Sequence, residues 1–243
     1  MDWQDQCSDR ANRDRVLSRL TRNLNLTENE QAKLNDLLGE TRVVTAEREI
    51  FREGENYPYA AVILDGWAHR YKLLEDGRKQ TFNFILPSEI SGVAHALGKE
   101  SIYTVEALTD CRISTLDVTR LLEMARSEPR LAVGLIWDET REIAMLQEHM
   151  TSLGRRTALE SLTHLVLELQ ARLRRIGEAN GSFKIPVTQK HLADMLGLSE
   201  VHVSRTLKQL RKDKLIDIYR GKVVIHLQDE AEDLAAFSPI YLE

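Results

Sequence analysis

One short stretch of the sequence combines the residue types that bind DNA. Residues 196–215 read LGLSEVHVSRTLKQLRKDKL, with a glycine and a serine ahead of two arginines and three lysines. At about 100° per residue, Val203, Leu207 and Leu210 share one helix face, which must be the buried one. The opposite face and its flanks then present Val201, His202, Ser204, Arg205, Lys208 and Lys212.

These exposed side chains suit the two kinds of contact that proteins make with DNA. An arginine can donate two hydrogen bonds to guanine O6 and N7, and a valine can contact the methyl group of thymine. Hydroxyl and cationic side chains suit phosphate contacts, which position a protein without reading the sequence. We expect base reading by Arg205, Val201, Glu200 and Ser204. We expect phosphate-backbone contacts by Thr188, Gln189, Ser199, His202, Lys208 and Lys222.

The surrounding sequence predicts the elements that position this helix. Thr188 can cap a short helix, QKHLADMLG, which Gly197 ends, and Ser199 can cap the next one. Ala193 before the glycine and Val203 after it allow the two helices to cross closely, which indicates a helix-turn-helix. The segment LIDIYRGKVVIHL then reads as a two-stranded wing.

Charge is unevenly distributed along the chain. The net charge is −5, but residues 154–226 hold 14 Lys and Arg against 7 Asp and Glu, so this segment carries +7 and the remainder −12. A basic segment on an acidic body favours a polyanionic partner. Helical hairpins with basic exposed faces also occur in protein-binding modules, so an adaptor that binds proteins is the alternative.

The region before this segment has the period of β-strands. Between Thr41 and Val118, short runs rich in β-branched and aromatic residues alternate with turn signals at Gly54, Gly66, Gly77 and Gly92. This pattern predicts an antiparallel sandwich or jelly-roll barrel. Ahead of it, residues 13–38 read as helix, in which Thr27 and Glu30 form a capping box before a stop at Gly39.

A long helix is predicted between the barrel and the basic segment, from Pro129 to Gly154. A stripe of apolar residues at heptad spacing follows it, interrupted by Glu139: Ile136, Ile143, Leu146, Met150 and Leu153. Periodicity alone leaves two readings open, a helix packed on its own domain or a two-stranded dimer seam.

The predicted fold class is α+β, with an antiparallel β-barrel sensor domain, a long dimerisation helix and a winged helix-turn-helix domain. We assign the tail and first helix to residues 1–24, the barrel to 25–128, the central helix to 129–154, the DNA-binding domain to 155–228, and a C-terminal tail to 229–243.

Several other classes of protein are disfavoured. The chain has no apolar run of about 18 residues and no secretory signal, so we expect a cytoplasmic protein without a membrane-spanning segment. Cys7 and Cys111 cannot form a metal or iron–sulfur set by themselves. A metal-dependent enzyme on the barrel is the rival from another class, but His69 and His95 lie 26 residues apart and no catalytic motif is present. We therefore expect no enzyme activity and no cofactor.

A β-rich domain, a long helix and a winged helix, in that order, resemble the Crp/Fnr family of bacterial transcription regulators. The likeness runs from about Asn25 to Leu227 and is carried by GENYPYAAVILDGWAHRYKLLEDGRKQTFNFILPSEISG and TQKHLADMLGLSEVHVSRTLKQL. Arg205 occupies the family's base-reading position. The resemblance implies a homodimer on a near-palindromic operator, and contact with RNA polymerase if the protein is an activator.

Two departures from the family's pattern change what is expected. Val201 stands four residues before Arg205, where many members have glutamate, so the half-site is expected to differ at that base pair. Cyclic-nucleotide binders hold the phosphate with a Gly-Glu pair and an Arg-Ser/Thr pair. Here the corresponding pairs are Gly92-Val93 and Ser101-Ile102, and together with Glu89 these residues form the expected effector pocket. Because no arginine meets the phosphate there, we expect no cyclic AMP binding. A haem ligand at His95 or His69 is a further, weaker alternative.

Overall fold

The computed structural model describes residues 27–242 apart from Leu97, Lys99 and Asn180. The chain forms two compact units, one running up to Lys72 and continuing over Phe84–Thr140, the other comprising Leu73–Asn83 and Arg141–Glu243. The helix predicted from residue 13 to 26 and Cys7 lie outside the described residues.

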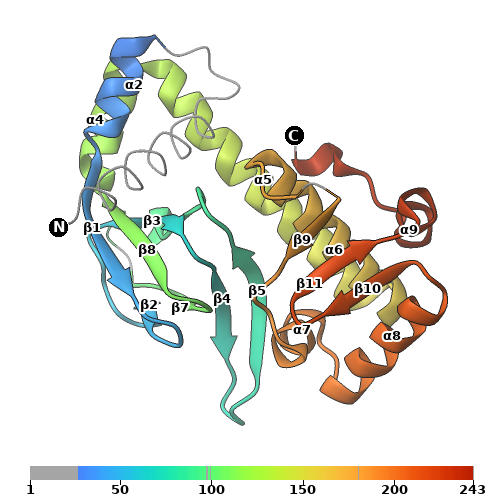
Figure 1. Cartoon of the computed structure of the whole chain (residues 1–243). Helices are drawn as coiled ribbons and strands as arrows, with labels where there is room; N and C mark the ends of the chain where they lie inside the picture. Colours follow the sequence, from blue (N-terminus) through green and yellow to red (C-terminus); the bar gives the residue numbers. More distant parts are fainter. Residues whose placement is uncertain (1–26, 97, 99, 180, 243) are drawn as a thin grey trace. The chain divides into compact units, whose positions relative to one another are not determined.

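Two four-stranded antiparallel sheets make up the β-region (Figure 1). Their orders are β1-β8-β3-β6 and β2-β7-β4-β5, so neighbouring strands are often distant in sequence. The strands are β1 (Leu38–Val44), β2 (Glu49–Phe51), β3 (Ala60–Asp65), β4 (Ala68–Leu73), β5 (Lys79–Ile85), β6 (Ile90–Ser91), β7 (Thr104–Ala107) and β8 (Cys111–Leu116). The predicted antiparallel β-domain is confirmed.

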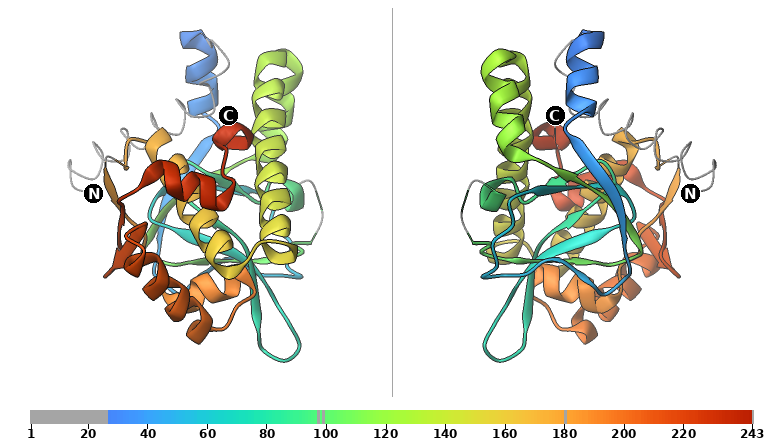
Figure 2. Two further views of the ribbon diagram at one scale, coloured as in Figure 1. Left: turned by 90° about the vertical axis from the view of Figure 1, so that its right-hand side faces the viewer. Right: turned by 90° about the vertical axis from the view of Figure 1, so that its left-hand side faces the viewer.

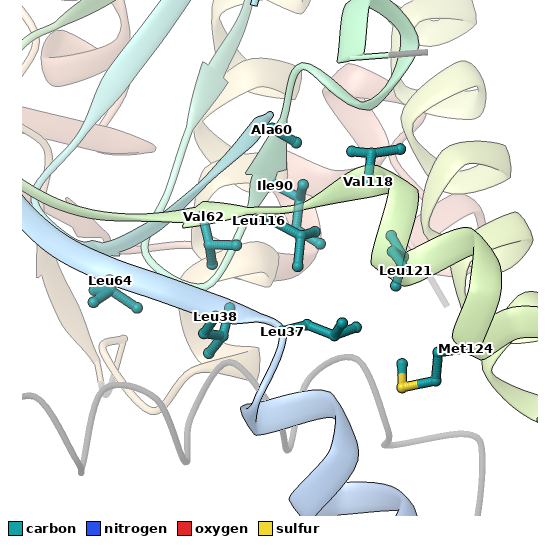
Figure 3. Close-up of a cluster of buried hydrophobic side chains, with 10 residues drawn as sticks. All are labelled: Leu37, Leu38, Ala60, Val62, Leu64, Ile90, Leu116, Val118, Leu121 and Met124. Carbon is teal, nitrogen blue, oxygen red and sulfur yellow. The ribbon is translucent and has the colours of Figure 1, made fainter. Parts of the chain in front are cut away.

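Strand β3 shows why the run AAVIL is almost entirely apolar. Successive side chains of a strand point to opposite faces, and here both faces are covered. Val62 and Leu64 join one cluster of buried side chains, whereas Ala61 and Ile63 join a second. The first cluster is completed by Leu121 and other residues drawn in Figure 3.

A helix that was not predicted covers the first cluster. Helix α4 (Val118–Ser127) follows β8 directly, and its N-cap residue Asp117 accepts a hydrogen bond from the Arg120 backbone amide. Leu121 and Met124 point from α4 into the cluster (Figure 3). The short helix α3 (Val93–Ala96), which directly follows the predicted turn at Gly92, was not predicted either.

The helix before the barrel begins as predicted but ends earlier. In helix α2 (Glu28–Asn35) the capping box is present, because the Thr27 amide donates to Glu30 Oε2 at 2.7 Å and the Glu30 amide donates to Thr27 Oγ1 at 3.3 Å. The expectation that Gly39 stops this helix was wrong. Gly39 lies in β1, where a Cβ atom would come within 2.4 Å of Thr115 Oγ1, so close strand approach explains the glycine.

The second unit contains the C-terminal half of the long helix and the winged helix. The long helix, α5, runs over Pro129–Gly154 as predicted. After it come α6 (Ala158–Arg175), α7 (Gln189–Leu196), α8 (Glu200–Lys212), α9 (Gln228–Ala235) and a 3-10 turn, η1 (Pro239–Leu242). Both predicted wing strands are present, β10 (Ile216–Tyr219) and β11 (Lys222–Ile225), and an unpredicted strand, β9 (Ser182–Lys184), pairs with β11. Figure 2 shows α9 lying along α6.

Candidate nucleic-acid interface

The turn between α7 and α8 has the local structure that its sequence predicts. Thr188 caps α7 by accepting a hydrogen bond from the His191 amide at 3.2 Å. Gly197 ends the helix in the left-handed conformation, at φ +63°, which glycine adopts without steric cost. Ser199 then caps α8 by accepting from the His202 amide. These three residues fix where the second helix begins.

The buried side of α8 differs from the prediction by one position. Val203 and Leu210 are fully buried as expected, but Leu207 is only half-buried and Thr206 is buried in addition. The hydroxyl of Thr206 donates to the His202 carbonyl at 3.0 Å. Because this bond satisfies the hydroxyl within the helix, threonine can occupy a core position that polarity alone would exclude.

The opposite side of α8 is open to solvent. Val201 is 69% exposed, and Glu200, His202, Arg205 and Lys208 are also exposed, whereas Ser204 is half-buried. Within the described residues, Arg205 and Lys208 form no ion pair, so both cations are available to a ligand. The expected backbone-contact residues outside α8 are exposed as well: Thr188, Gln189, Ser199 and Lys222.

Arg211, in contrast, is held by the wing. Its Nε donates to Asp217 Oδ1 at 2.8 Å, and a terminal nitrogen donates to the Ile218 carbonyl at 3.2 Å. The wing turns through Arg220 and Gly221, both at positive φ, as a two-residue hairpin turn requires. Arg211 thus fixes the wing against the end of α8 instead of offering a free charge. The sequence reasoning missed this role, although Arg211 and Asp217 are only six residues apart.

Helix α5 presents an apolar stripe to solvent. Ile136 is 64% exposed and Met150 is 70% exposed, and Ile143 and Leu153 are also exposed, whereas Leu146 is half-buried. Two further exposed apolar residues, Val133 and Trp137, were not predicted. Over the part of the chain that the structure describes, the stripe is thus largely uncovered.

The expected effector residues have different surroundings among the described residues. Ile102 is 73% exposed, and Val93 packs against the cluster in Figure 3. The Ser101 hydroxyl donates to the Tyr103 carbonyl at 2.7 Å. Buried Glu89 accepts a hydrogen bond from the Leu86 amide at 2.9 Å. Gly92 lies at φ +96°, where a Cβ atom would come within 2.5 Å of the His95 ring.

Two buried residues that the prediction did not combine, His95 and Arg70, contact Gly92 and its neighbour Ser91, respectively. The His95 ring lies 4.4 Å from the Phe51 ring, centroid to centroid, and burial lowers the pKa of His95, which favours a neutral imidazole. Arg70, from β4, donates to the Ser91 hydroxyl at 3.3 Å, and its guanidinium lies 4.5 Å from the Tyr103 ring centre. These side chains thus occupy part of the barrel interior. Phe51 and His95 are 44 residues apart in sequence, and Arg70 and Ser91 are 21 residues apart, so local spacing gave no signal of these contacts.

The cysteine, metal-site and membrane-helix alternatives can also be compared with the structure. Cys111 is fully buried, burial raises the pKa of its thiol to about 11, and it belongs to the second cluster of apolar side chains. Among the described residues, no three His, Cys, Asp or Glu side chains are grouped so that they could hold a metal ion. In the same part of the chain, no helix is long and apolar enough to cross a membrane.

A β-domain, a long helix and a winged helix with a free cationic face define a DNA-binding regulator. Comparisons with known proteins agree. The model of the Crp-like helix-turn-helix domain matches residues 160–232, and that of the cyclic nucleotide-binding domain matches residues 41–128. The chain belongs to the Crp/Fnr family of transcription regulators, whose members are not enzymes.

Individual relatives match most of the chain. The nitrogen fixation regulation protein FixK of Azorhizobium caulinodans is 32% identical over 77% of this chain and 75% of its own length. The transcriptional activatory protein AadR of Rhodopseudomonas palustris is 30% identical over 70% of both chains. The structure of FixK2 from Bradyrhizobium japonicum aligns with a TM-score of 0.75 and 27% identity, covering 83% of this chain and all of that one.

Proposed function

We propose that the protein is a homodimer that reads a near-palindromic DNA operator and does so without a cyclic nucleotide. The observation that carries this proposal is the solvent-facing side of α8, where Val201 and Arg205 lie one turn apart and both side chains are exposed, as a contact with a DNA base requires. A recognition helix places such residues against base edges in the major groove.

The dimer is supported by the uncovered stripe on α5. Contiguous apolar surface on a helix is stabilised when a second copy covers it, and heptad spacing allows two α5 helices to pair along their length. Two recognition helices would then meet half-sites about 34 Å apart, one helical turn of DNA. The same stripe, from Ile136 to Leu153, is therefore the proposed dimer seam.

Independence from cyclic nucleotides is supported by the barrel. The Ser101 hydroxyl is already bonded to Tyr103, Ile102 faces solvent, and His95 lies against Gly92. We expect titration of cyclic AMP into the protein to give no saturable heat and no change in DNA affinity. Saturable binding that raises operator affinity would contradict this part of the proposal, and Arg70 would then be the cation to replace.

The first experiment is selection of binding sites from a random duplex library with no added ligand. We expect an enriched inverted repeat whose half-sites lie about one helical turn apart. Failure to enrich any sequence, both with purified protein and in host extract, would contradict the proposal and favour the adaptor alternative.

A matched pair of variants then separates base reading from phosphate contact. On the selected site, Arg205→Ala should lose about 1–3 kcal/mol of discrimination at one base pair per half-site. Lys208→Ala, an exposed cation one turn further along α8, should weaken specific and random DNA alike and reduce the salt dependence. Equal losses on both kinds of DNA for both variants would exclude the role assigned to Arg205.

The names of relatives such as AadR describe activators. We extend this role to the present protein, which would then recruit RNA polymerase from its operator in the cytoplasm. Transcription in vitro from a promoter bearing the selected site tests it, with activation expected and repression as the contrary result.

A further inference from the structure

The acidic and then apolar tail after the wing has a defined place in the structure. We name residues 228–242 the C-terminal strap. Its helix α9 buries Ala231 and Ala235, and its final turn η1 buries Leu242. Both α9 and η1 pack on α6, the first helix of the DNA-binding domain (Figure 2). The strap is thus a covering layer on α6.

Aromatic contacts fix the end of the strap. The ring of His164, on α6, lies 5.2 Å from the Phe237 ring in an edge-to-face arrangement. It is stacked on Tyr241 at 6.0 Å with an interplanar angle of 12°. Ile240, which lies between Phe237 and Tyr241 in the sequence, is 74% exposed, so neighbouring side chains of the strap differ sharply in burial. This contrast provides a matched control position.

The hydroxyl of Tyr241 reaches a carboxylate that is fully buried. It donates to Glu168 Oε2 at 3.1 Å. The same oxygen bonds to His149 Nε2 at 2.9 Å, and Glu168 Oε1 accepts from Arg172 at 3.1 Å. We call these four residues, His149, Glu168, Arg172 and Tyr241, the Glu168 cluster. They join α5, α6 and the strap at a single carboxylate.

The cluster also holds the hairpin segment, residues 73–83 between β4 and the middle of β5. His149 Nδ1 lies 2.9 Å from the Phe82 carbonyl, and Arg172 donates to Asn83 Oδ1 at 3.0 Å. Because a carbonyl and an ionised carboxylate can only accept, His149 makes both of its bonds only when both ring nitrogens carry hydrogen. A third link, from Gln80 to the Met195 carbonyl, reaches α7 directly.

A buried charged cluster of this kind is poorly explained by stability alone. Removing a carboxylate and its partners from water has a cost that apolar packing would avoid, so such clusters do not by themselves make a fold more stable. Their hydrogen bonds are directional, however, and they form in only one arrangement of the elements that supply them. The arrangement in question is that of α5, α6, the hairpin segment and the strap.

We propose that Glu168 and Tyr241 are positioning residues for DNA reading. The strap holds Glu168 in place through Tyr241, and Glu168 in turn fixes the winged helix on the C-terminal half of α5. Because α5 is the proposed dimer seam, this bond network sets the distance and the rotation between the two recognition helices. The inference rests on the proposed function, a dimer on an inverted repeat.

The test is a series of operators in which the half-site separation is changed by one base pair. Each added pair moves one half-site by about 3.4 Å and rotates it by about 35°. For the wild-type protein we expect at least a tenfold loss of affinity for a one-pair insertion. In Tyr241→Phe, which keeps the stacked ring and removes only the hydroxyl, the loss should shrink at least threefold. Ile240→Ala should behave like the wild type.

His149→Gln supplies a second variant that acts on the same carboxylate oxygen. In the double variant, the fold-change in spacing tolerance should be smaller than the product of the fold-changes of His149→Gln and Tyr241→Phe, because both residues act through Glu168. An unchanged spacing profile in Tyr241→Phe would overturn the proposal. So would a uniform loss of affinity on every operator, because that would be the mark of a merely structural residue.

Hydrogen exchange of the full-length protein tests the proposal without DNA. Tyr241→Phe should speed amide exchange in residues 73–83, which are linked to Tyr241 through Glu168 and His149, whereas Ile240→Ala should not. Unchanged exchange there would overturn the inference. If wild-type protein selects no inverted repeat, the proposed function fails by itself, and the exchange experiment still decides whether the Glu168 cluster couples the strap to the hairpin segment.

Discussion

Different interactions stabilise the interior of the barrel and that of the DNA-binding unit, the second unit, which contains the winged helix. In the barrel, the second cluster joins apolar side chains from both sheets, and the ring of buried His95 lies edge-on against Phe51. In the DNA-binding unit, the long buried face of α6 has a carboxylate, Glu168, at its centre. The stability of the barrel interior thus depends mainly on the volume of its apolar side chains, whereas that of the second interior also depends on a charge held by hydrogen bonds at defined atoms.

Loss of volume in the barrel should have the largest effect on stability. Phe51 is fully buried and its ring contacts those of Tyr57, Tyr59 and His95. Phe51→Ala should lower the free energy of unfolding by about 3–5 kcal/mol, because it removes apolar contact and leaves a cavity. Urea denaturation measures this loss, with the exposed Ile102→Ala as a control within about 0.5 kcal/mol of wild type. A loss below about 1 kcal/mol at Phe51 would contradict the assignment.

A change of charge without a change of volume should matter most at Glu168. Burial alone would raise the pKa of Glu168, but His149 and Arg172 together hold it well below its ordinary value, so the group is ionised. Glu168→Gln keeps the size and leaves the Arg172 guanidinium without its buried counter-ion, and should cost about 3 kcal/mol. Glu160→Gln, on the same helix but in its solvent-accessible capping box, is the control and should lower the free energy of unfolding much less. Similar losses at the two positions would remove the distinction between the two interiors.

The two regions also differ in how far the sequence could predict them. The turn and caps around Gly197 depend on residues within a few positions of each other, so local rules were sufficient. The Glu168 cluster was not foreseen, because its partners come from residues 82, 149 and 241, and only the fold brings them together. Arg172, four residues after Glu168 on a leucine-rich helix, was the one local sign of a buried pair. Arg70 beside Ser91 was hidden in the same way, because β4 and β6 belong to different sheets.

Acid should weaken the DNA-binding unit through His164. Burial lowers the pKa of His164 to about 4, and Arg156 acts in the same direction, against Glu168 and Glu148. The folded state therefore binds a proton less readily than the unfolded chain, whose histidine has a pKa near 6.5. This contribution to stability is complete above pH ~6.5 and is lost as pH falls toward 4, amounting to about 2–3 kcal/mol by pH 4.5.

Urea denaturation of the wild-type protein and of His164→Phe at pH 7 and pH 4.5 checks this contribution. Phenylalanine keeps the ring against Tyr241 but cannot titrate, so the variant should lose less stability on acidification than the wild type. The pKa of His95 is also lowered by burial, so the barrel loses stability in the same direction, and both proteins retain that part. Equal acid sensitivity of the two proteins would falsify the assignment to His164.

The smallest effect is expected where one glycine turns the chain between α7 and α8. Gly197→Ala places a Cβ atom at φ +63° and 3.1 Å from Leu153 Cδ2, so it should cost about 1–2 kcal/mol, mostly from backbone strain. Gly177, which follows α6 at φ +77° with open space around it among the described atoms, is the matched control for strain alone. Gly92→Ala in the barrel should cost more than either, because its Cβ atom would meet the rings of His95 and Phe51 within 3 Å. If unfolding of the three variants gave equal losses, backbone strain would dominate in both regions, and the tighter packing inferred for the barrel around His95 would have to be given up.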